Sequence, residues 1–281
     1  MASRSRTYNT EGVVLRRRNL GEADSIFTVF SPTEGKFDAV ARGVRKPKSR
    51  MRGHLEPLTR SQMHLAQGRT LDVFTQAETV EGFRAIRDNL DRITVAIYCC
   101  ELVDRFTVDR AAQPQLYQLL LEVLEGLNAD APLTIGRAFE LHLLGLTGYE
   151  LQLSNCALCG ATLPAEEALF SAISGGLVCE SCRPRATTGR IVSVRAIKAM
   201  RFASRSSLGD FAGLRLDEEL ELELRRALGD AIRVVLDRDT NSGRYVEALA
   251  APLRAGLRGA LGDVQSPSPL TSERDSLNAP L

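Results

Sequence analysis

The sequence has 281 residues, of which 44% are hydrophobic and 25% charged, and this composition is that of an ordinary globular protein. It contains no apolar run of the roughly 18–20 residues that a transmembrane helix needs, and its basic N-terminus has no apolar segment behind it. We therefore expect no membrane partner and a cytoplasmic location, where the six cysteines stay reduced rather than forming disulfides.

The net charge of +1 conceals an uneven distribution of charge along the chain. Residues 1–82 carry 14 Lys and Arg against 9 Asp and Glu, whereas the remaining residues carry 22 against 26. A basic first part followed by a mildly acidic second part is typical of a protein whose first domain binds nucleic acid.

The basic first part, residues 1–82, has the pattern of short strands separated by turn residues. The strands that this pattern predicts cover residues 12–15, 24–30, 35–41, 58–65 and 70–79. Five strands without a long helix predict a five-stranded OB-fold barrel, and an SH3-like barrel is the alternative that periodicity leaves open. We expect this barrel to be the DNA-binding domain.

The second part of the chain, residues 83–250, is predicted to be a mostly α-helical domain. Apolar residues recur there at helical spacing, and the helices that they predict cover residues 83–109, 113–127, 132–148, 194–204 and 217–237. The fold class is therefore α+β multidomain. The acidic run that opens the last helix is interpreted as a solvated face that favours the helix dipole. Residues 251–281 are predicted to be a disordered tail.

Four cysteines interrupt the helical pattern within an insertion at residues 155–190. Cys156 and Cys159 form one C-x-x-C pair, Cys179 and Cys182 form another, and 19 residues separate the two pairs. This spacing is typical of a zinc site, in which each pair directs two thiolates at one ion. Four thiolates fill a tetrahedral shell and leave no position for water, so we expect one structural Zn²⁺ ion. Unligated core thiols are the alternative.

The other cysteines and the histidines suggest no second metal site. Cys99 and Cys100 lie in the middle of a predicted helix and are interpreted as small buried hydrophobic residues. The pair His54 and Glu56 matches the H-x-E element of zinc deaminases, but about a hundred residues separate it from the cysteines, of which there are too many for that chemistry. A C-x-x-C redox site is also disfavoured, because no thioredoxin-like context surrounds either pair.

Basic residues cluster at two places in the predicted barrel. One cluster lies in a loop between Arg42 and Arg52, which contains six cations and no acid; a second lies at the end of the first strand. We predict that both contact DNA phosphates, although a solvated basic loop is the alternative. Few aromatic residues accompany them, so we expect no sequence specificity. The predicted DNA-binding residues are Arg16, Arg17, Arg18, Arg42, Arg45, Lys46, Lys48, Arg50 and Arg52.

Several short motifs in this order resemble the RecO family of bacterial recombination mediators. The stretches that carry the resemblance are residues 10–16 (TEGVVLR), 20–25 (LGEADS), 43–50 (GVRKPKSR), 53–57 (GHLEP) and 72–78 (DVFTQAE). The resemblance continues through the helical region and the cysteine insertion, and spans residues 7–250. Within it, Arg45, Lys46, Lys48 and Arg50 match the stretch with which the family binds DNA.

The resemblance implies an OB-fold and a helical domain that carries zinc. It also implies binding of single- and double-stranded DNA, annealing of complementary strands and association with the nucleoid. The partners that it implies are RecR, the C-terminal tail of single-strand-binding protein and, indirectly, RecA, which the mediator helps to load onto coated strands.

No catalytic function is expected from the sequence. It lacks the G-x-x-x-x-G-K-[ST] motif of a nucleotide-binding loop and any nucleophile–base constellation, so we expect a protein that is not an enzyme. Two other functions stay open at this stage. One is a zinc-dependent nucleic-acid-processing enzyme that uses the basic barrel as a substrate clamp. The other is an interaction scaffold whose basic loop binds an acidic protein tail.

Overall fold

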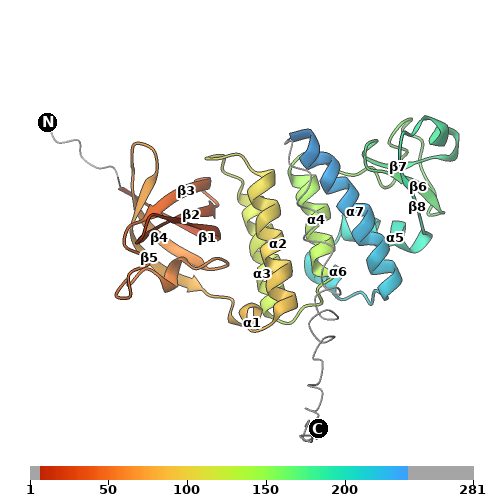
Figure 1. Cartoon of the computed structure of the whole chain (residues 1–281). Coiled ribbons are helices and arrows are strands. Elements are labelled where there is room, and N and C mark those ends of the chain that lie inside the picture. Colours follow the sequence, from red (N-terminus) through yellow and green to blue (C-terminus); the bar gives the residue numbers. More distant parts are fainter. Residues whose placement is uncertain (1–6, 240–281) are drawn as a thin grey trace, which may run out of the picture.

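The computed structural model describes residues 7–239 of the chain (Figure 1). The barrel lies at one end of the molecule, the helices form the middle, and a small lobe with three short strands lies at the far end. The predicted tail, residues 251–281, and the last part of the predicted helical domain lie outside the described residues. Within that described range no helix has the length and apolar character needed to cross a membrane.

Five strands close into the N-terminal barrel. They follow the order β1-β2-β3-β5-β4, β1 also pairs with β4, and the β3–β5 pair is parallel while the others are antiparallel. This is the connectivity of an OB-fold, so the predicted barrel is confirmed. The strands are β1 (Thr7–Leu20), β2 (Asp24–Ser31), β3 (Gly35–Ala41), β4 (Arg60–Ala66) and β5 (Asp72–Glu81).

The longest strand of the barrel, β1, extends well beyond the range predicted from the sequence. Residues 12–15 were expected, but the strand runs over 14 residues because its first half pairs with β4 and its second half with β2. A register shift between Val14 and Arg16 marks the change of partner. The two ends of β1 are mostly polar, and for this reason they lack the apolar alternation by which the strand was predicted.

Within residues 7–239, seven α-helices follow the barrel, and there is one 3₁₀ helix in the barrel and another in the far lobe. The α-helices are α1 (Arg84–Arg87), α2 (Leu90–Phe106), α3 (Pro114–Asn128), α4 (Ile135–Leu146), α5 (Val194–Ala203), α6 (Leu208–Ala212) and α7 (Glu218–Asp239). The predicted helix at 83–109 is divided into α1 and α2. Asn89 separates them, because its side chain accepts hydrogen bonds from the backbone N–H groups of Asp91 and Arg92 and caps α2.

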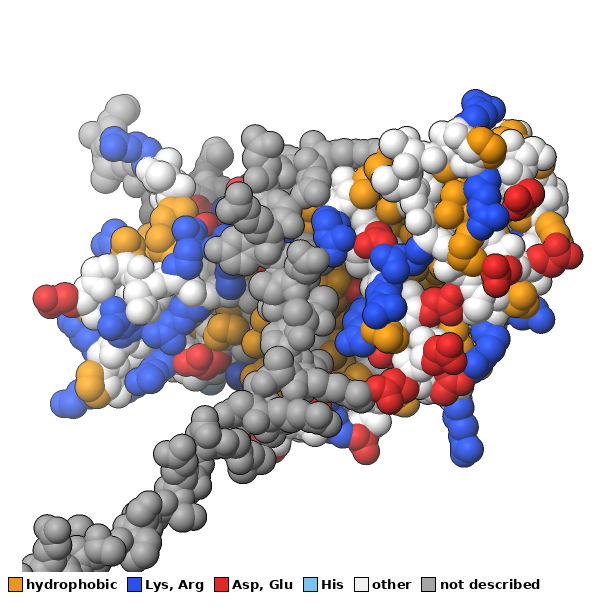
Figure 2. All heavy atoms as spheres, turned by 45° about the vertical axis from the view of Figure 1, so that its right-hand side comes forward, with side chains coloured by type: hydrophobic (Ala, Val, Ile, Leu, Met, Phe, Trp, Pro, Cys, Tyr) orange, Lys and Arg blue, Asp and Glu red, His pale blue; other side chains and the backbone are white. Residues whose placement is uncertain are grey.

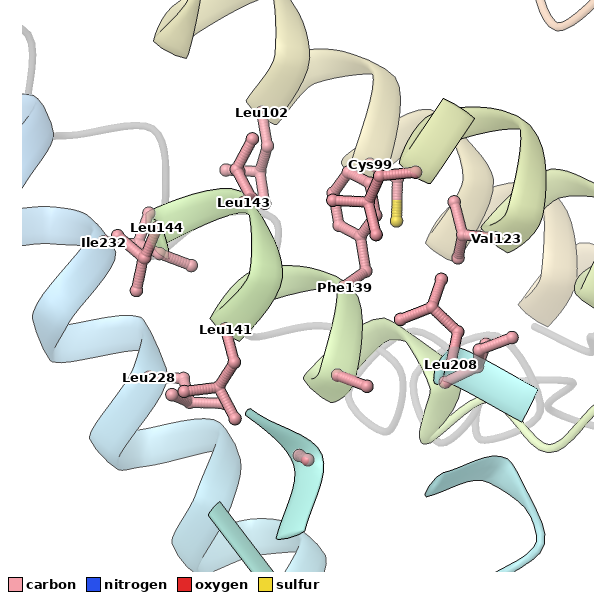
Figure 3. Close-up of a cluster of buried hydrophobic side chains, with 14 of the residues drawn as sticks. Cys99, Leu102, Val123, Phe139, Leu141, Leu143, Leu144, Leu208, Leu228 and Ile232 are labelled. Carbon is pink, nitrogen blue, oxygen red and sulfur yellow. The ribbon is translucent and has the colours of Figure 1, made fainter. Parts of the chain in front are cut away.

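Helix α4 lies at the centre of the helical domain and is covered by its neighbours. Figure 3 shows Phe139 of α4 beside Cys99 of α2, with Val123 of α3 close by, and Leu141 directed toward Leu228 of α7. All but Leu141 are fully buried, and Leu141 is nearly so. Cys99 is therefore part of the apolar core, as predicted.

The far lobe is the cysteine insertion, and it contains a small sheet that the sequence did not predict. Its strands are β6 (Ala168–Ser171), β7 (Gly176–Val178) and β8 (Arg190–Val192), in the order β7-β6-β8, and a 3₁₀ helix, η2 (Glu180–Arg185), follows β7. Strands of three or four residues are too short to show a periodicity. The lobe joins the rest of the domain through contacts of β8 with α7.

The barrel and the helical domain share one apolar core. Val13 of β1 and Phe30 of β2 are fully buried in the same cluster of side chains as the residues of α2 and α3. The rings of Phe30 and Tyr117 of α3 lie 6.1 Å apart, and the Tyr117 hydroxyl donates a hydrogen bond to Glu11 of β1 at 2.9 Å. One outer face of the barrel is therefore occupied by helices.

The loop after α2 closes one end of the barrel through Arg110. Its guanidinium pairs with Asp72 at the start of β5 and lies 4.6 Å from the ring centroid of Phe37. The Tyr8 hydroxyl donates to the same carboxylate at 2.6 Å. Burial tends to raise the pKa of Asp72, but the hydrogen bonds from Tyr8, Arg110 and Gly68 lower it below its usual value.

The same loop packs tightly against the turn between β2 and β3. Gly35 has φ of +67°, and a Cβ atom there would lie 2.3 Å from the carbonyl oxygen of Ala111. The backbone N–H of Arg110 also donates to the carbonyl of Lys36 at 2.7 Å. A side chain at position 35 would therefore separate the loop from the barrel.

We predict that Arg110→Ala lowers the free energy of unfolding by about 1–3 kcal/mol, because it leaves the largely buried Asp72 carboxylate without its cation. Urea unfolding followed by circular dichroism measures the change. The loss should shrink in acid, since a carboxyl group with a lowered folded-state pKa stabilises the fold only above its unfolded pKa of about 3.9 and ceases to do so as the pH falls through the folded value.

Arg105→Ala is the matched control, because Arg105 pairs with Glu101 along the surface of α2. Removing that pair should cost about 0.5 kcal/mol or less. Equal losses in the two variants would show that Arg110 does not fasten the domains together.

Candidate nucleic-acid interface and metal centre

The basic loop, residues 42–52, is anchored to the barrel at both ends. Val44 is buried in the barrel core, and so is Leu55 of the 3₁₀ helix η1 (Gly53–Leu55) that follows the loop. The backbone N–H of Gly43 donates to the Asp24 carboxylate at 2.7 Å, next to the turn between β1 and β2. The loop is therefore held against the barrel at both ends.

All six cations of the basic loop have exposed side chains. In the part of the chain that the structure describes, none of them forms an ion pair with a carboxylate; Arg45 donates a hydrogen bond to the Gly21 carbonyl at 2.9 Å. On the face shown in Figure 2, basic side chains predominate on the barrel, whereas acidic and basic side chains are mixed on the helical domain. The loop cations are Arg42, Arg45, Lys46, Lys48, Arg50 and Arg52.

The three arginines at the end of β1 lie in a different electrostatic environment. Each pairs with an acidic residue that is distant in sequence. Arg16 bonds Asp104 of α2 at 2.6 Å and Arg18 pairs with Asp38 of β3. Arg17 lies 3.5 Å from Glu56 and stacks over the ring of Phe27 at 5.9 Å. Their charges are thus paired within the protein, unlike those of the basic loop. That these three arginines contact DNA stays a prediction.

Asp104 is shared between two strands of the barrel. It accepts from Arg16 of β1 and, at 3.2 Å, from Lys36 of β3, whose ammonium group also donates to the Asp104 carbonyl at 2.6 Å. Both cations therefore fasten the barrel to α2. This face of β1 and β3 is occupied by an internal network of charges rather than by free cations.

A polar groove of about 820 Å³ lies beside the basic loop. Arg50 and Met51 of the loop and His54 of η1 form part of its wall, and residues of β1, β4 and β5, Met63 and Ala77 among them, form the rest. These strand residues were not predicted as a site, because polar side chains that alternate with buried ones are typical of any solvated face of a sheet. Their grouping depends on the register of three strands, and no signal in the sequence reports that register.

The four predicted metal ligands come together in the far lobe. The sulfur atoms of Cys156, Cys159, Cys179 and Cys182 all lie within 4.8 Å of one another. Each pair sits on a tight turn: Gly160 N–H donates to the Cys156 carbonyl at 2.8 Å, and Cys182 N–H to the Cys179 carbonyl at 3.0 Å. Gly160 has φ of +75°, which the first turn requires.

The donor set fits a metal ion. Burial tends to raise the pKa of Cys156, but backbone N–H groups of Cys179, Leu158 and Cys159 bond its sulfur and lower the pKa to about 6. Hydrogen bonds with the neighbouring thiols raise the pKa of Cys182 to about 12. Without a cation, Cys156 therefore loses its proton more easily than Cys182 does. A divalent ion would favour the thiolate form of all four cysteines.

Within residues 7–239 the four cysteines form the only group of three or more potential metal ligands. His54 and Glu56, the deaminase-like pair, belong to no such group. Cys100, like Cys99, is buried, and burial raises its pKa to about 12, which makes it an unreactive core thiol.

Comparison with known proteins gives matches over both parts of the chain. The family described as "Recombination protein O N terminal" matches residues 3–83, and "Recombination protein O C terminal" matches residues 87–244. The chain is 36% identical over 260 residues to a protein of Roseiflexus sp. (strain RS-1) named "DNA repair protein RecO", which covers 92% of each chain.

Two further relatives carry the same name. A protein of Dehalococcoides mccartyi (strain CBDB1) is 35% identical over 243 residues, covering 86% of this chain and 96% of its own length. A protein of Symbiobacterium thermophilum is 34% identical over 246 residues, covering 86% of this chain and 97% of its own.

Proposed function

The chain belongs to the recombination protein O family, which gives it a role in DNA repair and recombination, and we propose that it binds single- and double-stranded DNA through the basic loop and anneals complementary strands. The observation that carries this proposal is the set of six exposed, locally unbalanced cations on an anchored loop. A loop of fixed path holds these charges where a phosphate backbone can follow them, at a small cost in conformational entropy.

Phosphate contacts explain both binding modes. Both single strands and duplexes carry regularly spaced phosphates, and neither sequence nor pairing is needed for lysine and arginine side chains to neutralise them. Binding of this kind releases counterions, so we expect the affinity to fall steeply as salt rises. The six loop cations are the residues to which we assign these contacts.

Annealing then follows from charge neutralisation. Two complementary strands repel each other, and a protein that balances phosphates on both raises their rate of encounter. No covalent step is needed, so we assign the chain the function of a mediator rather than an enzyme. A zinc-dependent enzyme would need an open metal position, and a shell of four thiolates leaves none.

Further partners are proposed on family membership alone. We propose that the chain cooperates with RecR to load RecA onto strands coated by single-strand-binding protein, whose C-terminal tail would bind this chain, and that it acts at the nucleoid.

We assign the four-cysteine cluster to one structural Zn²⁺ ion. Tetrahedral coordination by four thiolates is the arrangement that structural zinc prefers, and the two tight turns supply two sulfur atoms each. Zinc at this place would join the loop between α4 and β6, which carries Cys156 and Cys159, to the segment after β7, which carries Cys179 and Cys182. Arg201 of α5 already fastens the lobe to the helices by donating to the carbonyls of Leu153 and Leu163 at 2.7 and 2.9 Å.

The triple variant Arg45→Glu/Lys46→Glu/Lys48→Glu tests the DNA-binding proposal. At about 0.1 M salt each lost contact with a single strand removes about 0.7 log units of affinity, so we expect a loss of about 100-fold or more. Annealing, followed without ATP by fluorescence of labelled complementary strands, should be lost as well. The melting temperature should change little, because these side chains are exposed.

The control variant reverses three exposed cations of the helical domain and its insertion, Arg185, Lys198 and Arg215, and so changes the net charge equally. Its affinity should stay close to that of the wild type. If both variants bind DNA equally well, the interface lies outside the basic loop.

The zinc assignment is tested with Cys156→Ser and Cys179→Ser. Each variant should bind less than one zinc ion per chain, measured by mass spectrometry of the metal, and should unfold more easily by several kcal/mol, because zinc binding is coupled to folding. Cys100→Ala removes a buried thiol outside the cluster and should keep its zinc. If wild-type protein purified without zinc gains no stability when zinc is added, that result would contradict the assignment.

A further inference from the structure

Apart from Arg50, the proposed phosphate contacts do not use the polar groove beside the basic loop. It lies on the outward side of β4 and β5 and ends at the basic loop, since Arg50 belongs to both. Residues of the groove with polar side chains come from β1, β4, β5 and η1. They are Asn9, His54, Gln62, His64, Thr75, Gln76 and Glu78.

The register of the barrel brings these side chains into a row. Asn9 of β1 pairs with His64 of β4, and His64 pairs with Gln76 of β5, so three neutral polar side chains lie side by side across three strands. Gln62 and Glu78 are also cross-strand partners and form the next row. Side chains at such positions are close enough to bind one ligand together.

The hydrogen bonds of His54 leave a donor available. The backbone N–H of Thr79 donates to Nδ1 of His54 at 3.2 Å, so Nδ1 carries no proton. The proton of the neutral ring is therefore on Nε2, which has no other partner among residues 7–239 and can donate to a ligand.

His64 has the opposite arrangement. The Thr75 hydroxyl donates to the His64 carbonyl at 2.9 Å, and that hydroxyl must then accept from Nδ1–H of His64 at 2.7 Å. In the neutral ring Nε2 is therefore an acceptor. The groove thus contains one imidazole donor, Nε2–H of His54, and one imidazole acceptor, Nε2 of His64. The side-chain amides of Asn9, Gln62 and Gln76 each add a hydrogen-bond donor and an acceptor.

The charges of the groove do not suit a phosphate. Arg50 is the only cation among the residues that line it, and it lies at the border with the basic loop, whereas Glu78 lies within the groove and repels anions. A matching ligand is uncharged, polar and rich in both donors and acceptors. It must also be attached to an anion that follows the basic loop. The edges of nucleobases have these properties.

We propose that the groove binds the bases of a single DNA strand whose phosphates follow the basic loop. This inference rests on the proposed DNA binding and adds to it a means of distinguishing single strands from duplexes, because the edges of paired bases are engaged with each other. No Phe, Tyr or Trp lines the groove, so bases are held there mainly by hydrogen bonds. Bases held in this way exchange readily, as annealing requires.

The double variant His64→Ala/Gln76→Ala of the full chain tests the proposal. With a labelled single strand of mixed sequence we expect the Kd to rise about 10-fold, the effect of losing one good set of base contacts, while the Kd for the matching duplex stays within about 2-fold. Gln115→Ala/Gln118→Ala, which removes two exposed amides from α3, is the control and should change neither value.

A strand without bases supplies the second measurement. Wild-type protein should bind this abasic strand about 10-fold more weakly than the mixed-sequence strand, and the groove variant should bind the two equally. Equal losses for single strands and duplexes, or a wild-type protein that does not distinguish the abasic strand, would overturn the proposal.

The outcome separates this inference from the proposed function. If the wild type binds neither form of DNA, the proposed function itself fails. If the wild type binds both forms and the groove variant behaves like it, the groove alone is excluded as a base-binding site.

Discussion

The ion pairs between the barrel and α2 determine which part of the barrel is free to bind nucleic acid. Asp104 of α2 accepts from Arg16 and Lys36 of the barrel. Arg110, in the loop after α2, pairs with Asp72 at the start of β5. Together with the shared apolar core, these contacts cover one outer face of the barrel with helices and balance the cations there. The basic loop and the adjoining face of β4 and β5 are left open.

The basic loop on the open side of the barrel is held in place by the barrel core. Val44 and Leu55 are buried in that core on either side of five of the six exposed cations, so the packing that stabilises the barrel also positions these charges. The cysteine cluster lies at the far end of the molecule, beyond α4 and α7 (Figure 1). In this arrangement zinc would stabilise the helical domain, and the chemistry of DNA binding would belong to the barrel.

Features that depend on local pattern could be predicted from the sequence. The two C-x-x-C pairs and the strand at residues 35–41 were predicted because neighbouring residues define them. Features that depend on distant partners could not. Arg16, Arg17 and Arg18 looked as free as the loop cations, because Asp104, Glu56 and Asp38 are far away in the chain. The groove is equally invisible in the sequence, since only the strand register places Asn9, His64 and Gln76 in one row.

The salt dependence of single-strand binding tests most directly whether the ion pairs divide the nine predicted cations into six that are free and three that are engaged. Each phosphate contact contributes about −0.7 to the slope of log K against log salt concentration. Six loop cations therefore give a slope of about −4, which is the result that this account predicts. A slope of about −6 would mean that Arg16, Arg17 and Arg18 leave their carboxylates to bind DNA, and would contradict it.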